Sequence, residues 1–239
     1  MRVDATSYRE TAEAVAELVA HGEGGAVCVA TVHMVMEAFD DPAFRGIVNA
    51  ADRVTPDGVP LVWALRWLGV EEAERVYGPS LLSALCELAR ERGLSVGFYG
   101  GCPEVVDELV RRSWARFPGL DVAFAFAPPH RPLSAEEDRK VVDGISASGV
   151  DILFVGLGCP KQERWIAAHR ASLDCVMVGV GAAFDFHAGA KPQAPAWLQA
   201  CGLEWLFRLG CEPRRLWRRY LLGNPRFMIH FARQWSRQR

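Results

Sequence analysis

The sequence predicts an α/β protein of Rossmann-like type, with a mostly parallel sheet, helices on both faces of that sheet, and a C-terminal helical appendage. Short β-branched runs alternate with longer helical patterns through most of the 239 residues, an order typical of a parallel sheet covered on both sides. After Ala194 this alternation stops, and a helical segment rich in Trp and Arg follows. We therefore expect an α/β domain over residues 1–193 and the appendage over residues 194–239.

The individual elements follow from hydrophobic period and capping residues. The expected strands are Ala26–Val32, Arg53–Thr55, Ser95–Tyr99, Leu120–Phe126, Asp151–Val155 and Cys175–Val180. The expected helices are Asp41–Ala50, Pro60–Leu68, Ser80–Arg92, Pro103–Phe117, Ser134–Ala147 and Lys161–His169. Ser80 and Ser134 suit helix N-termini, and Glu137 lies three residues after Ser134, which predicts a capping box.

Composition favours a folded cytoplasmic protein. Half of the residues are hydrophobic and 23% are charged, which is enough apolar material for a core. The seven cysteines are odd in number and include no C-x-x-C pair, so we expect reduced thiols rather than a disulfide framework or a zinc site. The N-terminus lacks a secretory signal, and no apolar run approaches the roughly 20 residues that span a bilayer. Any membrane contact is therefore expected to be peripheral.

Charge is unevenly distributed. The net charge of −2 gives no indication of a nucleic-acid partner. Arginines nevertheless accumulate from Arg208 to Arg239, where Glu212 is the single acidic residue. This segment is consistent with a solvated basic helix, with phosphate binding by arginine side chains, or with an interfacial helix on an anionic membrane.

The first candidate site residues follow the first two strands. Ligands of open parallel sheets bind at the carboxyl ends of the strands. Thr31 and His33 could there bind a base or ribose, or be an ordinary strand-end Thr and a surface His. In the turn between Pro56 and Gly58, Asp57 is expected to be exposed and could take a proton from a sugar hydroxyl. The alternative for Asp57 is an ordinary turn or N-cap residue.

Two glycine-containing turns are candidate phosphate sites. Gly100 and Gly101 precede a helix, where backbone N–H groups and the helix dipole favour an anion, although a plain β–α turn would use the same residues. The second segment runs from the strand end Val155 through Gly158 into a helix. Its backbone amides and the side chain of Lys161 suit a diphosphate.

Side chains that could recognise the nucleoside follow at once. Gln162 and Glu163 suit base or ribose hydroxyls. The dinucleotide fingerprint, the P-loop and the D-x-D pattern of metal-dependent transferases are all missing, so we expect neither a cofactor nor a metal.

Taken in order, these segments resemble the WecG/TagA/CpsF family, glycosyltransferase family 26. The matching stretches are Thr31–His33, Thr55–Gly58, Val155–Glu163, Gly181–Phe186, Ala194–Pro195, Gly202–Arg208, Glu212–Arg215 and Arg219–Tyr220. Each stretch is modest alone, but the ordered set is specific.

The resemblance implies an inverting, metal-independent transferase. It would move an N-acetylmannosamine-type or related hexose from a UDP-sugar to a polyprenyl-diphosphate-linked sugar in cell-surface polysaccharide synthesis. Asp57 matches the family's proposed catalytic base. Thr31, Gly100, Gly101 and Gln162 match positions around the UDP-sugar. Three appendage arginines match residues thought to complete the site and bind phosphates: Arg208, Arg215 and Arg218.

Two positions depart from the family pattern. His33 stands where many members have Asn, and Ser80 stands where many have Asp. Because both lie near the expected sugar, the resemblance implies a hexose without naming it. The expected partners are the UDP-sugar, the lipid-linked or another glycosyl acceptor, the inner face of the membrane through the basic helices, and a second copy of the chain. The rival functions are a soluble tailoring glycosyltransferase of secondary metabolism and a non-catalytic nucleotide-binding or interaction module.

Overall fold

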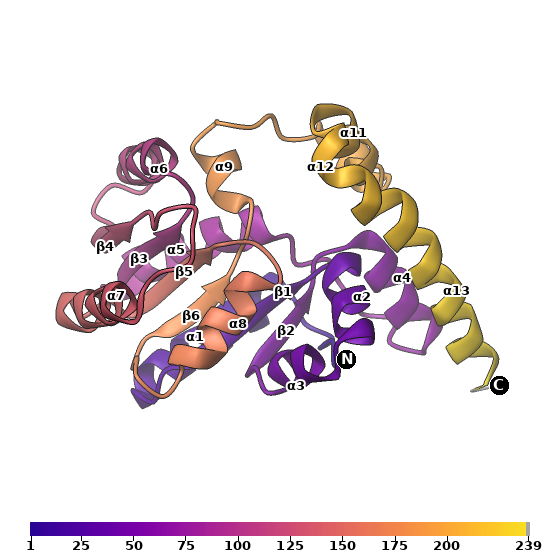
Figure 1. Ribbon diagram of the computed structural model, residues 1–239, viewed down its shortest axis with the longest axis horizontal. Helices are drawn as coiled ribbons and strands as arrows, with labels where there is room; N and C mark the ends of the chain where they lie inside the picture. The colour runs from indigo at the N-terminus through magenta and orange to yellow at the C-terminus, as the bar shows by residue number, and fades with distance from the viewer. Residues whose placement is uncertain (238–239) are drawn as a thin grey trace.

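A single parallel sheet of six strands forms the centre of the protein (Figure 1). The computed structural model describes residues 1–237, so Arg239 of the basic segment lies outside the described residues. The strands are β1 (Gly25–Ala30), β2 (Arg53–Pro56), β3 (Ser95–Gly100), β4 (Asp121–Phe126), β5 (Ile152–Gly156) and β6 (Val176–Gly179). Their order is β2-β1-β6-β5-β3-β4, and each neighbouring pair is parallel. The predicted fold class is confirmed.

Helices cover both faces of the sheet. One face carries α1 (Tyr8–His21), α5 (Gly78–Arg92), α6 (Pro103–Arg116) and α9 (Ala183–His187). The other carries α2 (Val32–Asp40), α3 (Pro42–Asn49), α7 (Ala135–Ser148) and α8 (Lys161–His169), with α4 (Val59–Trp67) beside them. Alternate residues of β1 enter the two cores: Val27 and Val29 face one, and Cys28 faces the other. This period of two is that of a strand buried on both faces.

After the central strands the chain turns to opposite faces of the sheet, and this leaves a crevice between the loops. β6 lies between β1 and β5. The helix that follows β6 packs on the α1–α5 face, whereas α2 and α8, which follow β1 and β5, pack on the other face. Loops that diverge in this way leave room for a ligand outside the carboxyl ends of the strands.

The predicted strands and helices are all present with small differences at their ends, but three helices within residues 1–193 were missed: α1, α2 and α9. The capping box at Ser134 is confirmed, because Ser134 Oγ accepts from the N–H of Glu137 and the carboxylate of Glu137 accepts from the N–H of Ser134. Ser80 is not an N-cap, since α5 begins at Gly78. The first strand ends at Ala30 rather than Val32, and helix α2 starts there instead.

The appendage packs along the edge of the sheet domain formed by α2 and α4 (Figure 1). It consists of α10 (Ala196–Ala200), α11 (Glu204–Cys211), α12 (Pro213–Trp217), a π-helical turn (Arg218–Leu222) and α13 (Gly223–Ser236). Phe227 and Phe231 of α13 are buried in the same core cluster as α2, and the ring of Phe231 stacks on Trp67 with centroids 5.7 Å apart. Arg226 of α13 also pairs with Asp40 of α2. None of the helices within residues 1–237 combines the length and apolarity needed to cross a membrane.

Candidate active site

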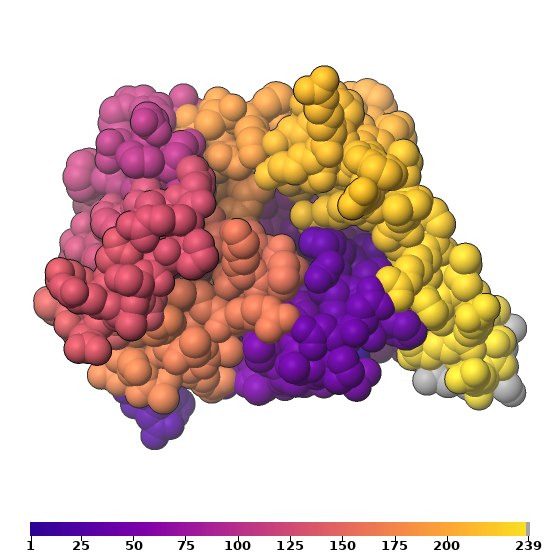
Figure 2. Space-filling view, viewed as in Figure 1, coloured from indigo at the N-terminus to yellow at the C-terminus, as the bar shows by residue number. Residues whose placement is uncertain are grey.

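A large cleft lies at the carboxyl ends of the strands, between the sheet domain and the appendage. Its volume is about 1410 Å³. Figure 2 shows the hollow between the yellow appendage and the rest of the molecule. Residues far apart in the chain line it, from Thr31 after β1 to Arg226 in α13. The cleft therefore occupies the place where the topology leaves a crevice.

The structure brings most of the predicted site residues to this cleft. Those that line it are Thr31, His33, Asp57, Gly101, Gly158, Lys161, Gln162, Arg208, Arg215 and Arg218. Gly100 and Glu163 are not among the lining residues.

Gly100 has a packing reason to be glycine. It is the last residue of β3, its φ is +128°, and a Cβ there would lie 2.5 Å from the carbonyl carbon of Gly156 on β5. The backbones of β3 and β5 thus approach closely at their carboxyl ends. Its neighbour Gly101 faces the cleft.

The loop between β5 and α8 is held by the side chain of Gln162. Gln162 Oε1 accepts from the N–H of Gly158 at 3.1 Å, and its Nε2 donates to Glu163 Oε1 at 2.7 Å. Burial raises the pKa of Glu163, whose Oε2 finds no partner within residues 1–237. The buried side chains of Gln162 and Glu163 therefore support the loop. Lys161, at the first position of α8, is exposed and lines the cleft.

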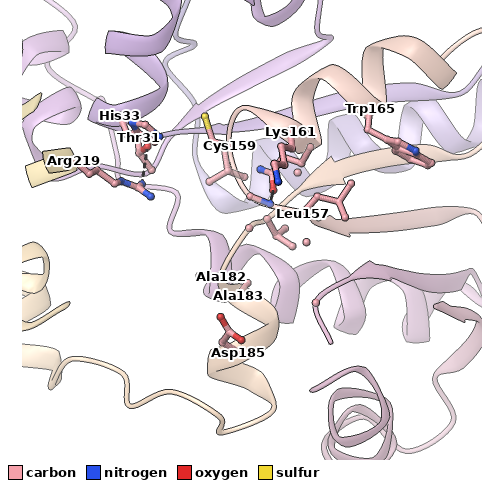
Figure 3. A pocket seen from close by; sticks show the side chains of 18 of the residues that line it. Thr31, His33, Leu157, Cys159, Lys161, Trp165, Ala182, Ala183, Asp185 and Arg219 are labelled. Carbon is pink, nitrogen blue, oxygen red and sulfur yellow. Dashed lines mark hydrogen bonds between the residues drawn. The ribbon is translucent and has the colours of Figure 1, made fainter. Parts of the chain in front are cut away.

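Thr31 and His33 begin a helix instead of extending a strand. Thr31 is the N-cap of α2, and its Oγ1 accepts from the N–H of Met34 at 3.4 Å and from Arg219 Nη2 at 3.2 Å. His33 lies in the first turn of α2. Burial, and then the charge of Arg219, lower the pKa of His33 to about 4, so its imidazole is neutral at pH 7. Figure 3 shows Thr31, His33 and Arg219 gathered at one end of the cleft, apart from Asp185 of α9.

Asp57 is at the predicted place but is largely covered, which corrects the expectation that it is exposed. Only 15% of its side chain is accessible. Arg75 Nη2 lies 3.1 Å from Asp57 Oδ1, and Arg75 Nε donates to the backbone oxygen of the same residue. The carboxylate of Glu204, at the first position of α11, lies 2.6 Å from Arg75 Nη2. Burial raises the pKa of Asp57; the cation of Arg75 opposes this shift and the anion of Glu204 adds to it.

Arginines of the appendage give the cleft a positive wall. Arg219 is half-buried, and its buried Nε has no hydrogen-bond partner within residues 1–237. The guanidinium of Arg208 lies 5.4 Å from the ring centre of Phe186, and that of Arg218 lies 5.2 Å from the ring centre of Trp217. Arg215 pairs with Glu212. Planar guanidinium groups at one opening suit a ligand with several phosphate oxygens.

Sequence reasoning missed several residues of the cleft. Arg75 lies on a stretch that carries no motif, and Glu204 lies in the matching stretch Gly202–Arg208 but was given no role. Both line a small cavity next to the cleft, where Arg75 contacts Asp57 and Glu204 contacts Arg75. Asp185 and Lys191 both line the cleft and pair at 2.7 Å. Arg219 could have been found, because it adjoins Arg218 in the basic helix. Within the described part of the chain, no three His, Cys, Asp or Glu side chains are arranged to hold a metal ion.

The topology and the site define an α/β protein whose cleft is lined by arginines and by a largely buried carboxylate. The model of the glycosyl transferase WecG/TagA/CpsF family matches residues 1–239, so the chain belongs to this family and is a glycosyltransferase. This confirms the resemblance seen in the sequence and leaves the non-catalytic module without support.

Curated relatives agree with this assignment. A protein of Bacillus spizizenii named N-acetylglucosaminyldiphosphoundecaprenol N-acetyl-β-D-mannosaminyltransferase is 31% identical over 207 residues, which are 86% of this chain and 78% of the relative. A protein of Staphylococcus aureus with the same name is 31% identical over 208 residues, which are 87% of this chain and 79% of the relative.

Proposed function

We propose that the protein transfers an N-acetylmannosamine-type hexose from a UDP-sugar to a polyprenyl-diphosphate-linked sugar, in the synthesis of a cell-surface polysaccharide. One observation carries the proposal: the same cleft is lined by Asp57, a carboxylate whose pKa is raised, and by the arginines of the appendage. The names of the relatives support the sugar and the lipid-linked acceptor, since both describe transfer of N-acetylmannosamine to N-acetylglucosaminyl-diphosphoundecaprenol.

In this proposal Asp57 acts as the general base. The acceptor hydroxyl gives its proton to the carboxylate, and its oxygen attacks the anomeric carbon. The bond between that carbon and the diphosphate oxygen breaks on the opposite face, so UDP leaves and the configuration inverts. A carboxylate held by burial in a more basic state is suited to this proton transfer.

The charge of the leaving UDP would be balanced by protein groups instead of a metal. Lys161 and the backbone of Gly101 and Gly158 line the cleft on the sheet side. Arg208 and Arg219 line it on the appendage side. Preorganised cations and N–H groups that face a developing charge are usually a large part of such catalysis.

The appendage is also the proposed membrane contact. It exposes large apolar side chains that do not line the cleft, among them Leu206, Trp217, Leu221 and Ile229. Arg214, Arg215 and Arg218 are exposed on the same helices. Each arginine near an anionic leaflet contributes about 1 kcal/mol, and the apolar side chains can enter the headgroup region. Sedimentation with anionic vesicles measures this contact, and protein that stays in the supernatant would contradict it.

The function is tested by an Asp57→Asn variant in an assay of UDP release from UDP-N-acetylmannosamine with a synthetic lipid-linked acceptor. The variant should still bind the donor in calorimetry, and its turnover should fall about 10²- to 10⁴-fold because the base is lost. Asp143→Asn on the exposed surface of α7 is the matched control and should keep full activity.

Two results would contradict the proposal. An Asp57→Asn enzyme with unimpaired turnover would remove the assignment of the base. Transfer to a water-soluble aglycone, with none to the lipid-linked acceptor, would instead favour the soluble tailoring transferase.

A further inference from the structure

Arg75 connects the two parts of the protein through two carboxylates. It lies in the segment between α4 and α5. One of its terminal nitrogens, Nη2, is 3.1 Å from Asp57 Oδ1 in the sheet domain and 2.6 Å from Glu204 Oε2 in the appendage. In the chain, Arg75 is 18 positions from Asp57 and 129 positions from Glu204. The bridge therefore exists only while the appendage is packed on the sheet domain.

The bridge is shielded from solvent. The accessible fractions of the side chains are 21% for Arg75, 15% for Asp57 and 10% for Glu204. Charges in such surroundings interact more strongly than on an open surface. A carboxylate as covered as Glu204 needs a partner, because an unpaired buried charge is strongly unfavourable. Arg75 is the only cation with which Glu204 forms an ion pair among the described residues.

The shorter of the two contacts goes to Glu204. The single positive charge of Arg75 is thus divided between two anions, and the group of three carries one excess negative charge when both acids are ionised. If Glu204 were withdrawn, Arg75 would pair with Asp57 alone, and the carboxylate would hold a proton less readily.

We propose that Glu204 is a positioning residue for the transfer: it binds Arg75 from the appendage, so that this cation neutralises Asp57 only in part. The proposal rests on the proposed function, in which Asp57 is the base. Its consequence is that docking of the appendage makes Asp57 a stronger base. With the appendage displaced, Arg75 pairs with Asp57 alone and makes it a weaker base, which suppresses hydrolysis of the donor in an open cleft.

Other groups near Asp57 set the background on which Glu204 acts. The titratable and charged side chains that face Asp57 or line the small cavity beside it are His33, Arg75, Tyr77, Glu204, Arg208, Arg219 and Tyr220. Arg75 lies over the ring of Tyr77, 4.4 Å from its centre. Among these groups Glu204 is the only carboxylate besides Asp57. Its replacement by a neutral side chain removes one negative charge and therefore lowers the pKa of Asp57.

The test is the pH profile of kcat/KM for the full-length Glu204→Gln variant, with the lipid-linked acceptor. The acid limb of this profile reports the ionisation of the base in the free enzyme. Loss of the anion should move the limb to lower pH. On the plateau, kcat should fall on the order of tenfold, because Asp57 becomes a weaker base. A role limited to packing would lower kcat without moving the limb.

Companion variants keep the result interpretable. Glu204→Met fills similar space without charge and should move the limb in the same direction, even if Glu204→Gln folds poorly. Glu204→Asp keeps the charge and should hold the limb close to its original pH. Asp40→Asn removes a different contact of the appendage, the exposed pair with Arg226, and should leave the limb in place.

The outcomes separate this inference from the proposed function. A limb that stays in place or moves to higher pH in both Glu204→Gln and Glu204→Met would overturn the positioning role, while an inactive Asp57→Asn enzyme would still support the base. An active Asp57→Asn enzyme would overturn the base itself.

Discussion

At the scale of single residues, His33 shows how burial selects a charge state. It occupies the first turn of α2 beside Arg219, and its pKa is lowered to about 4 by burial and by that cation. A neutral imidazole can donate one hydrogen bond and accept another. A protonated one would place a second positive charge against Arg219. The position therefore presents a neutral polar group to the cleft.

The lowered pKa of His33 makes a prediction about stability. In the unfolded chain a histidine titrates near pH 6.5, so between about pH 6.5 and pH 4 the unfolded state binds a proton that the folded state does not. Stability contributed by the neutral side chain is thus lost as the pH falls through this window. Between pH 7 and pH 5 the free energy of unfolding of the natural protein should fall by roughly 1–2 kcal/mol more than that of His33→Gln.

Urea denaturation at both pH values measures this difference. His21→Gln, an exposed histidine at the end of α1, serves as the control and should follow the natural protein. Equal losses in His33→Gln and the natural protein would show that His33 is protonated without penalty in the folded state.

At the scale of elements, local patterns predicted most of the sheet. All six strands were found, and their bounds differ by at most two residues, because each is a short apolar run between turn residues. The failure at Thr31–Val32 has a local cause. Both residues favour strands, yet the hydroxyl of Thr31 caps the N–H of Met34, and the chain turns into α2.

For the appendage, the family resemblance predicted three arginines that line the cleft: Arg208, Arg215 and Arg218. The rest of the candidate site was predicted only as far as its residues follow strand ends. Thr31, Asp57 and Lys161 do so, and parallel topology brings strand ends together. Arg75 and Glu204 do not, since neither follows a strand; the contact of Arg219 with Thr31 spans 188 residues of sequence. Such pairs arise from docking of the appendage, for which no spacing rule exists.

The close approach of β3 and β5 gives a prediction for Gly100. An alanine there would place its Cβ 2.5 Å from the carbonyl carbon of Gly156, at a φ of +128° that side chains disfavour. Steric overlap and backbone strain together should lower the free energy of unfolding by roughly 3 kcal/mol or more. Gly46→Ala is the control, because a Cβ at this exposed position of α3 would meet no atom within 4 Å. It should raise stability by up to about 1 kcal/mol. Equal stabilities of the two variants in urea denaturation would contradict the packing argument.

At the scale of the whole molecule, the appendage has two different surfaces. The inner one carries Phe227 and Phe231 into the core cluster of α2 and brings Glu204 and Arg219 to the cleft. The other carries exposed side chains that do not line the cleft, among them Leu206, Ile229 and Arg214. Under the proposed function, a segment that lines the cleft and also contacts a membrane would couple the reaction to the place where a lipid-linked acceptor resides.

Removal of the appendage after Gln193 tests this coupling. The six strands and most of both core clusters lie before this residue, so the truncated protein should still fold. It should unfold at a lower temperature, because the faces of α2 and α4 that cover Phe227 and Phe231 become exposed. Transfer should fall by at least about 10²-fold, since Arg208 and Arg219 no longer face the leaving group and Glu204 no longer holds Arg75. Binding to anionic vesicles should be lost with the exposed arginines and apolar side chains.

Circular dichroism, UDP release and vesicle sedimentation measure the three effects on one preparation. A folded truncated protein with full transfer would separate the appendage from catalysis, and one that still sediments with vesicles would place the membrane contact on the sheet domain.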